Sequence, residues 1–332
     1  MKKFINKIDR MLIESLSGFA SAHSDIVEVH FEPTFVTRKH KAHNKVALIS
    51  GGGSGHEPLH TGYIGKGMLD AACPGQVFTS PTPDQMLAAA EAVHADKGVL
   101  FIVKNYAGDV MNFEMSAEIL TFEHATILTS DDCAVINSTY TTGRRGVAGT
   151  MIIEKCVGSL AETGADLATC KALGDKINQR TASIGVALNS CTVPAAGRPT
   201  FDISDTELEM GVGIHGEPGC RRESMREADA IINDMVAAIV ADFTNKSLSL
   251  KGEIILLING LGATPLMELY LIYNTAAKLL NAQGCQITHK LVGNYTTAID
   301  MTGASITVCL LDAEIKEHWE SAVHTAALRW GY

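Results

Sequence analysis

Short apolar segments that run directly into glycine-rich or polar loops most constrain the fold of this chain. Residues 45–50 lead into the glycine loop at 51–55, and the apolar residues 98–103 lead into the polar cluster at 104–109. Uninterrupted apolar runs of this length are typical of parallel strands that helices cover on both faces. Open α/β sheets place ligands at the carboxyl ends of such strands. We therefore expect an α/β fold whose ligand site lies in these loops.

The remaining patterns predict alternating helices and strands in both halves of the chain. Helices are expected over residues 4–20, 82–95, 112–120, 165–179, 223–243, 264–284 and 313–329, with another after residue 150, and strands over 45–50, 98–103, 126–129, 183–188, 253–258, 286–292 and 305–311. This alternation predicts two α/β layered domains, each a mixed sheet covered by helices. Residues 189–206 carry few helix signals, and we place the boundary near residue 182, which gives domains at 1–182 and 183–332.

Composition excludes several classes of protein. With 332 residues, two domains are expected. The formal net charge of −10 argues against nucleic acid or an anionic membrane surface as the main partner. No apolar run approaches the roughly 18 residues that a transmembrane helix needs. The first ten residues contain no continuous apolar segment typical of a signal peptide, so a cytoplasmic location is expected.

The cysteines and most histidines predict no metal site. The eight cysteines are scattered, and none lies in a C-x-x-C pair. They are interpreted as free thiols of a reducing compartment. His56 and His60 have the spacing of a helical zinc pair, but Pro58 lies between them and no further ligand completes a site.

Two loops of similar composition each carry a histidine. His56 follows the glycine loop at 51–55, and His215 lies in the glycine-rich stretch 211–219. Glycine permits sharp turns and close approach to the backbone, which leaves an imidazole uncrowded. The similarity of the two loops, about 160 residues apart, predicts that the fold brings both histidines to one site.

The paired Arg144 and Arg145 leave two interpretations open. They precede a predicted helix and could hold an anion or an acidic patch of a partner near the mouth of the site. As ordinary surface charges they would need no explanation. The glycine loops themselves contain neither the Gly-Lys-Ser/Thr end of a Walker A loop nor a complete G-x-G-x-x-G, so no ATP or NAD signature is present.

Six segments, in the same order along the chain, resemble dihydroxyacetone kinases. They read GGGSGHEP at 51–58, AACPGQVFTSPTPDQ at 71–85, VKNYAGDVMNFEMS at 103–116, GRRGVAGT at 143–150, TVPAAGRP at 192–199 and GVGIHGEPG at 211–219. Within that family, the chain is similar to the dihydroxyacetone-binding subunits of the bacterial phosphoenolpyruvate-dependent enzymes. Members that use ATP directly carry an additional nucleotide-binding domain in the same chain. This chain stops before such a domain could fit, which favours the multi-subunit version.

The resemblance implies a role for each matching residue. His215 would bind the ketone covalently through Nε2 as a hemiaminal, and His56 would act as a general base toward the hydroxyl that is phosphorylated. Asp109 would hydrogen-bond the substrate and share that proton transfer. The substrate hydroxyls would be held by Lys104 and by the backbone of Gly53, Ser54 and Gly55.

The resemblance also implies partners and leaves alternatives. The phosphoryl donor would be a separate subunit that carries ADP and Mg²⁺ and is recharged by a phosphotransferase-system protein, so no cofactor is expected in this chain, which would form a homodimer. One alternative is a non-catalytic sensor that binds dihydroxyacetone and then a transcriptional activator. Another is a nucleotide-dependent enzyme that uses the glycine loops. Only the kinase needs His56 and Asp109, and both are present.

Overall fold

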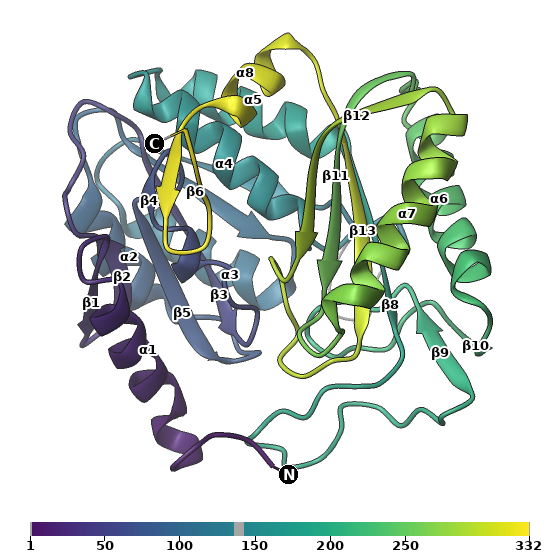
Figure 1. Ribbon diagram of the computed structural model, residues 1–332. Helices are drawn as coiled ribbons and strands as arrows, with labels where there is room; N and C mark the ends of the chain where they lie inside the picture. Colours follow the sequence, from purple (N-terminus) through teal and green to yellow (C-terminus); the bar gives the residue numbers. More distant parts are fainter. Residues whose placement is uncertain (1, 136–142, 332) are drawn as a thin grey trace.

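The computed structural model describes residues 2–135 and 143–331 and contains two six-stranded mixed sheets with helices packed against them (Figure 1). The first sheet has the order β1 (Val27–Phe31), β2 (Thr34–Arg38), β5 (Ala71–Val77), β3 (Ala47–Ser54), β6 (Val99–Lys104) and β7 (His124–Thr129). The strands from β5 to β7 are parallel, and β1 and β2 add an antiparallel hairpin at one edge. The glycine loop predicted at 51–55 is largely the end of β3 itself.

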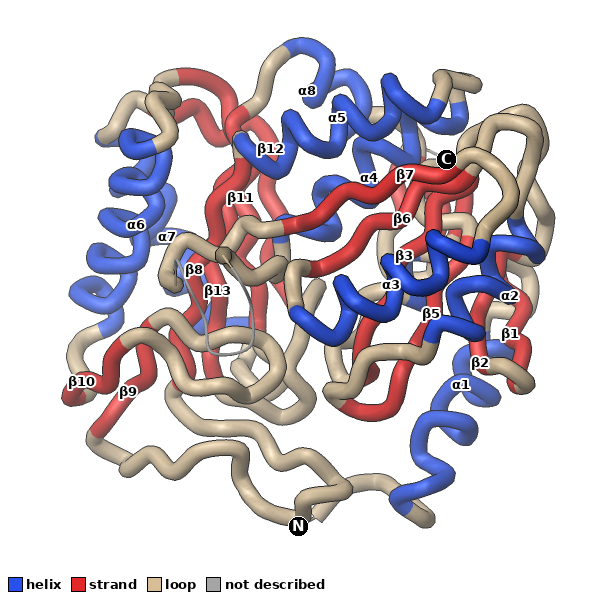
Figure 2. The backbone as a smooth tube through the Cα atoms, turned by 180° about the vertical axis from the view of Figure 1, so that it is seen from behind, coloured by secondary structure: helices blue, strands red, loops and turns tan. Residues whose placement is uncertain are grey.

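Helices cover the first sheet on both faces, as its apolar strands predicted. Leu100 and Ile102 of β6 pack with α4 (Gly149–Glu162) and α5 (Leu167–Gln179), whereas Phe101 packs on the opposite face with α2 (Pro83–Val93) and α3 (Ala107–Ile119). Figure 2 shows α2 and α3 in front of this sheet. The helix α2 begins with Thr82 and Gln85 as a capping box and proline at its first position, as expected from the sequence.

The second sheet packs against helices of both halves of the chain. Its order is β10 (Arg221–Ser224), β9 (Glu207–Met210), β8 (Thr181–Ala187), β13 (Gly303–Leu310), β11 (Gly252–Gly260) and β12 (Cys285–Gly293). One face packs against α6 (Ala228–Asn245) and α7 (Leu266–Ala282), which lie on the outer side in Figure 1. On the other face, Ile255 and Leu257 join the core cluster that contains α4. The predicted fold of two mixed sheets covered by helices is confirmed, while the division at residue 182 stays a prediction.

Several predicted elements differ from the structure. The last helix, α8, ends at Glu320 and not near residue 329. The following residues form β14 (Val323–Thr325) and β15 (Arg329–Trp330), and β14 pairs with β15 on one side and with β4 (Gly65–Lys66) on the other. Val323 fits the helical period, but it is buried in the core of the first sheet as part of a strand. At the N-terminus, α1 (Met11–Ala22) begins only after a short 3₁₀ turn at Ile8–Arg10, and Phe4 is fully exposed.

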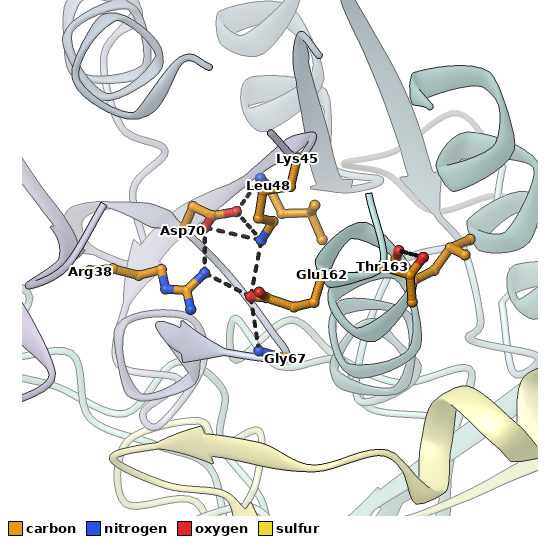
Figure 3. Close-up of polar contacts among 8 residues, drawn as sticks. Arg38, Lys45, Leu48, Gly67, Asp70, Glu162 and Thr163 are labelled. Atoms are coloured by element: carbon orange, nitrogen blue, oxygen red, sulfur yellow. Dashed lines mark hydrogen bonds and ion pairs between the residues drawn. The ribbon is translucent and has the colours of Figure 1, made fainter. Parts of the chain in front are cut away.

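A balanced cluster of four charged side chains ties the end of α4 to the first sheet (Figure 3). Arg38 Nη1 lies 2.8 Å from both Asp70 Oδ1 and Glu162 Oε1, and Lys45 Nζ lies 2.8 Å from Asp70 Oδ2 and 3.3 Å from Glu162 Oε1. Burial alone would raise the pKa of Asp70, but Lys45 and Arg38 together hold it below its ordinary value. Two cations thus face two carboxylates, and the cluster is structural.

None of the helices in residues 2–135 and 143–331 is long and apolar enough to cross a membrane.

Candidate functional site

The structure brings His56 and His215 together from opposite halves of the chain. The centroids of the two rings are 4.5 Å apart, with an interplanar angle of 80°. His56 Nδ1 lies 2.8 Å from the carbonyl oxygen of Thr297, between β12 and β13, and the ring stacks on Phe78. A carbonyl accepts only, so the proton of the neutral ring is on Nδ1. The lone pair on His56 Nε2 is therefore free, and this buried atom has no hydrogen-bond partner.

Aromatic rings and burial keep both imidazoles neutral. Tyr106 and Phe78 lie edge-on to the ring of His215, with centroids 4.2 and 5.6 Å away. Burial lowers the pKa of His56 to about 3, with a further contribution from the charge of Lys104. Burial also lowers the pKa of His215 well below its ordinary value, and His56 and Lys104 add to the effect. A neutral imidazole near pH 7 is a competent nucleophile or base.

A buried ion pair fixes the loop that carries His215. Glu217 Oε2 accepts the backbone N–H of His215 at 2.8 Å, and Glu217 Oε1 lies 3.3 Å from Arg145 Nη1. Arg145 also donates to the carbonyl of Gly211 at 2.7 Å and pairs with Asp132 at 2.5 Å. A Cβ atom at Gly213 would overlap the Glu217 carboxylate, so this close approach requires glycine.

Both sequence interpretations of Arg145 are therefore wrong. Its side chain is 1% exposed and fully paired, because two buried carboxylates and a carbonyl surround it. With so little exposed surface it is not accessible to solvent or to a partner, and it holds the His215 loop in place through Glu217 and the carbonyl of Gly211. Arg144 keeps 23% of its side chain exposed and pairs with Asp242 on α6.

Lys104 and Asp109 lie at the carboxyl end of β6, as the strand pattern predicted. Lys104 is completely buried, and its Nζ atom lies 3.1 Å from the carbonyl oxygen of Gly51 and 3.7 Å from Asp109 Oδ2. Helix α3 begins at Ala107, earlier than expected, and this places Asp109 in its first turn. Asp109 is 1% exposed, and its Oδ2 atom has no hydrogen-bond partner. Burial raises the pKa of Asp109, although Lys104 and Ser80 oppose the shift.

The glycine loop packs directly on these side chains. A Cβ atom at Gly52, where φ is +156°, would overlap Lys104 Nζ. A Cβ atom at Gly53 would come within 2.6 Å of the backbone nitrogen of Thr79. The hydroxyl of Ser54 donates to the carbonyl of Gly75 at 2.6 Å, and the backbone N–H of Gly55 donates to the Glu57 carboxylate. The loop is thus held rigidly against the end of β6.

Sequence reasoning missed two buried groups beneath the loop. His60 Nε2 lies 2.7 Å from Lys104 Nζ, and His60 Nδ1 lies 2.6 Å from Glu154 Oε1 on α4. Glu154 could have been found because it and Lys155 are the charged residues in the apolar segment 151–161, and a buried glutamate needs a partner. The described residues contain no group of three or more histidine, cysteine or acidic side chains that could hold a metal ion.

Comparison with known proteins identifies the family. The Dak1 domain profile matches residues 17–327. The chain is 46% identical, over the full length of both proteins, to the dihydroxyacetone-binding subunit of the phosphoenolpyruvate-dependent dihydroxyacetone kinase of Escherichia coli K12.

Two solved structures share the fold. A dihydroxyacetone kinase operon co-activator superposes with a TM-score of 0.89 at 31% identity, covering 97% of this chain and 98% of the other. The dihydroxyacetone kinase of C. freundii gives a TM-score of 0.88 at 33% identity, and the match covers 99% of this chain and 60% of that longer chain. With these matches the resemblance of the six motifs is confirmed, and the chain belongs to the Dak1-domain family of dihydroxyacetone kinases.

Proposed function

We propose that this chain binds dihydroxyacetone covalently as a hemiaminal on His215 and presents its hydroxyl for phosphoryl transfer from an ADP-carrying partner subunit. The product is dihydroxyacetone phosphate. The observation that carries the proposal is the pair of neutral histidines, His56 and His215, whose rings lie 4.5 Å apart. The name of the E. coli relative, a dihydroxyacetone-binding subunit, supports the same substrate.

The binding step uses the neutral ring of His215 as nucleophile. Its Nε2 lone pair forms a bond to the ketone carbon while the carbon–oxygen double bond becomes single. The ring loses its proton as the former carbonyl oxygen gains one, so the adduct is neutral. Ketones and aldehydes react in this way and polyols do not. A short carbonyl sugar is therefore selected over glycerol without a finely shaped pocket.

The transfer step needs an acceptor for the hydroxyl proton. His56 Nε2 and Asp109 Oδ2 are both buried acceptors without a hydrogen-bond partner. Lys104, 3.7 Å from Asp109 Oδ2, supplies a positive charge beside the reacting hydroxyl. The backbone of Gly53, Ser54 and Gly55 would hold the substrate hydroxyls. The partner would bring ADP and Mg²⁺ and be recharged by a phosphotransferase-system protein, and this chain would work as a homodimer.

A sensor is the second candidate, because a co-activator of a dihydroxyacetone kinase operon shares the fold at a TM-score of 0.89. Such a protein would bind dihydroxyacetone without transferring a phosphoryl group. His56 and Asp109 favour the kinase, since binding through His215 alone would require neither of them as a base.

Reconstitution separates these functions. We expect the chain to produce dihydroxyacetone phosphate when it is mixed with the donor subunit, the phosphotransferase-system proteins and phosphoenolpyruvate. With ATP alone it should produce none, because the sequence carries no nucleotide-phosphate loop. Product formation is measured with a coupled reductase. Adduct formation without transfer would favour the sensor, and robust turnover with ATP alone would refute the multi-subunit mechanism.

Adduct formation should be nearly independent of pH between about pH 5.5 and pH 8. The pKa of His56 lies at about 3, and that of His215 lies well below its ordinary value, so neither ring gains a proton in this range. The adduct fraction is measured by intact-protein mass spectrometry after incubation at each pH. A loss of adduct below about pH 6.5, the ordinary imidazole pKa, would show that His215 titrates normally and would contradict the site described here.

A further inference from the structure

Four ionisable side chains form a continuous buried line beneath the glycine loop. Asp109 Oδ2 lies 3.7 Å from Lys104 Nζ, which lies 2.7 Å from His60 Nε2. On the other side of the imidazole, His60 Nδ1 lies 2.6 Å from Glu154 Oε1. None of the four residues is more than 5% exposed, and Lys104 and Glu154 are completely buried. The line runs from Asp109 on α3 to Glu154 on α4.

The hydrogen bonds around His60 determine its proton position. Ser50 Oγ lies 2.9 Å from His60 Nδ1 and donates its own proton to the carbonyl of Ile102 at 2.7 Å. Ser50 can therefore only accept from the ring, and so can an ionised Glu154. The proton of the neutral ring is on Nδ1, and Nε2 accepts a hydrogen bond from the ammonium group of Lys104. In this state the Lys104–His60 and His60–Glu154 links each have a donor and an acceptor, while Lys104 Nζ and Asp109 Oδ2, 3.7 Å apart, form an ion pair without a hydrogen bond.

The line carries an unbalanced charge. Lys104 is the one cation between two carboxylates, and both Asp109 Oδ2 and Glu154 Oε2 are buried without a hydrogen-bond partner. The cluster in Figure 3 shows the contrast, because Glu162, eight residues further along α4, faces both Arg38 and Lys45. An excess of buried negative charge favours the uptake of one proton. Of the two glutamates Glu154 and Glu162 on α4, Glu154 is therefore the one that is expected to accept a proton.

Phosphoryl transfer to a hydroxyl releases one proton per turnover, and Asp109, which is 1% exposed, cannot pass this proton to water until the product has left the site. We propose that Lys104, His60 and Glu154 form a relay that moves this proton from Asp109 to Glu154. The proposal rests on the proposed function of the His215 site. His60 and Glu154 act through Lys104 and do not touch the substrate.

The relay balances in atoms and charge. The hydroxyl O–H bond breaks and Asp109 takes the proton. As Asp109 passes it to Lys104 Nζ, Lys104 gives one of its own protons to His60 Nε2, and His60 Nδ1 gives its proton to Glu154 Oε1. Lys104 ends as an ammonium group, His60 ends as the other neutral tautomer, and Glu154 ends as a neutral acid. The steps reverse when the product leaves and water enters the site.

The surroundings of Glu154 support proton transfer from Asp109 toward Glu154. The ionisable groups that face it are Lys104, His60 and Tyr63. Burial raises the pKa of Glu154 to about 8, although Lys104 opposes the shift. Burial lowers the pKa of His60 well below its ordinary value, so the ring relays protons by exchanging tautomers and never as an imidazolium. The hydroxyl of Tyr63 donates to the carbonyl of Tyr295, and its pKa is raised by burial, so it stays neutral.

Replacement of Glu154 by glutamine tests the relay. The amide oxygen of Glu154→Gln still accepts from His60 Nδ1, but the side chain cannot take a proton. We expect kcat to fall by about 10²-fold, the size of a lost proton acceptor, with an unchanged KM and an unchanged adduct on His215. The wild-type kcat should rise with pH as Glu154 ionises and level off above about pH 8. This rise should disappear in Glu154→Gln and return in part in Glu154→Asp.

The matched control is Glu162→Gln, on the same helix. It removes a paired carboxylate from the cluster of Arg38, Lys45 and Asp70, so it should lower thermal stability and leave kcat and its pH profile unchanged. Equal kinetic losses in both variants would mean that helix α4 is merely destabilised, which overturns the relay. A pH profile of kcat in Glu154→Gln that matches the wild type would also overturn the relay.

A flat wild-type kcat between about pH 6 and pH 9 overturns the relay even if the variants do not fold. A wild-type chain that transfers no phosphoryl group refutes the proposed function and the relay together. Normal transfer with a flat profile refutes the relay alone.

Discussion

Replacing His215 by alanine is expected to abolish the covalent adduct with dihydroxyacetone and to lower phosphoryl transfer by about 10²-fold or more. The methyl group of alanine offers no lone pair. The ring of His56 is fixed by the hydrogen bond of its Nδ1 atom to the Thr297 carbonyl at 2.8 Å and by its stacking on Phe78, so it cannot move into the place of the His215 ring. Under the proposed mechanism, loss of the bond to carbon would leave the reacting hydroxyl without a fixed position relative to Asp109. The adduct is measured by intact-protein mass spectrometry, and transfer by the reconstituted assay.

His124→Ala is the matched control for this variant. His124 is exposed on β7, and its Nδ1 atom lies 3.0 Å from the carbonyl oxygen of Phe122, so its loss should change neither adduct nor transfer. A covalent adduct that persists in His215→Ala would place the nucleophile elsewhere. His56→Ala should lie between wild type and His215→Ala, since it removes a base and a neighbour of the substrate but leaves the nucleophile intact.

The position of the site could be predicted from the sequence because its loops follow apolar strands. The run at 98–103 becomes β6, and Lys104 and Asp109 lie at its carboxyl end. The two glycine-rich loops also carry their histidines to one place, with ring centroids 4.5 Å apart. Glycines and strand ends are local features, and a sequence displays them directly. The roles of the residues at the site came from the resemblance and remain proposals.

What the sequence did not reveal depends on contacts between distant residues. In the sequence, nothing distinguishes Arg145 from a surface charge. In the structure it is paired with Asp132 and Glu217, which are 13 and 72 residues away along the chain. His60 suggested a metal pair with His56, yet its partners are Lys104 and Glu154. The C-terminal residues fit a helical period, and only the pairing of β14 with β4 shows that they form strands. The spacing of residues along the chain predicts none of these contacts.

Replacing Asp109 by asparagine should separate binding from transfer. The rings that surround His215 are His56, Phe78 and Tyr106, so the adduct should form as in the wild type. Transfer should fall by roughly 10²–10⁴-fold, because the amide is nearly isosteric with the carboxylate but cannot take the hydroxyl proton. Adduct mass and single-turnover transfer are measured on the same preparation. If Asp109→Asn transfers the phosphoryl group at the wild-type rate, Asp109 is not the base, and His56 is left in that role.

Combining Asp109→Asn with Glu154→Gln decides whether the two carboxylates act in sequence. If the proton reaches Glu154 only through Asp109 and Lys104, Asp109→Asn already blocks the path. Glu154→Gln should then cause no further loss of transfer. The double variant should then transfer at the rate of Asp109→Asn alone. Independent residues would multiply their separate losses instead, since their free-energy changes add. A multiplied loss would mean that Glu154 supports the site without lying on the path of the proton.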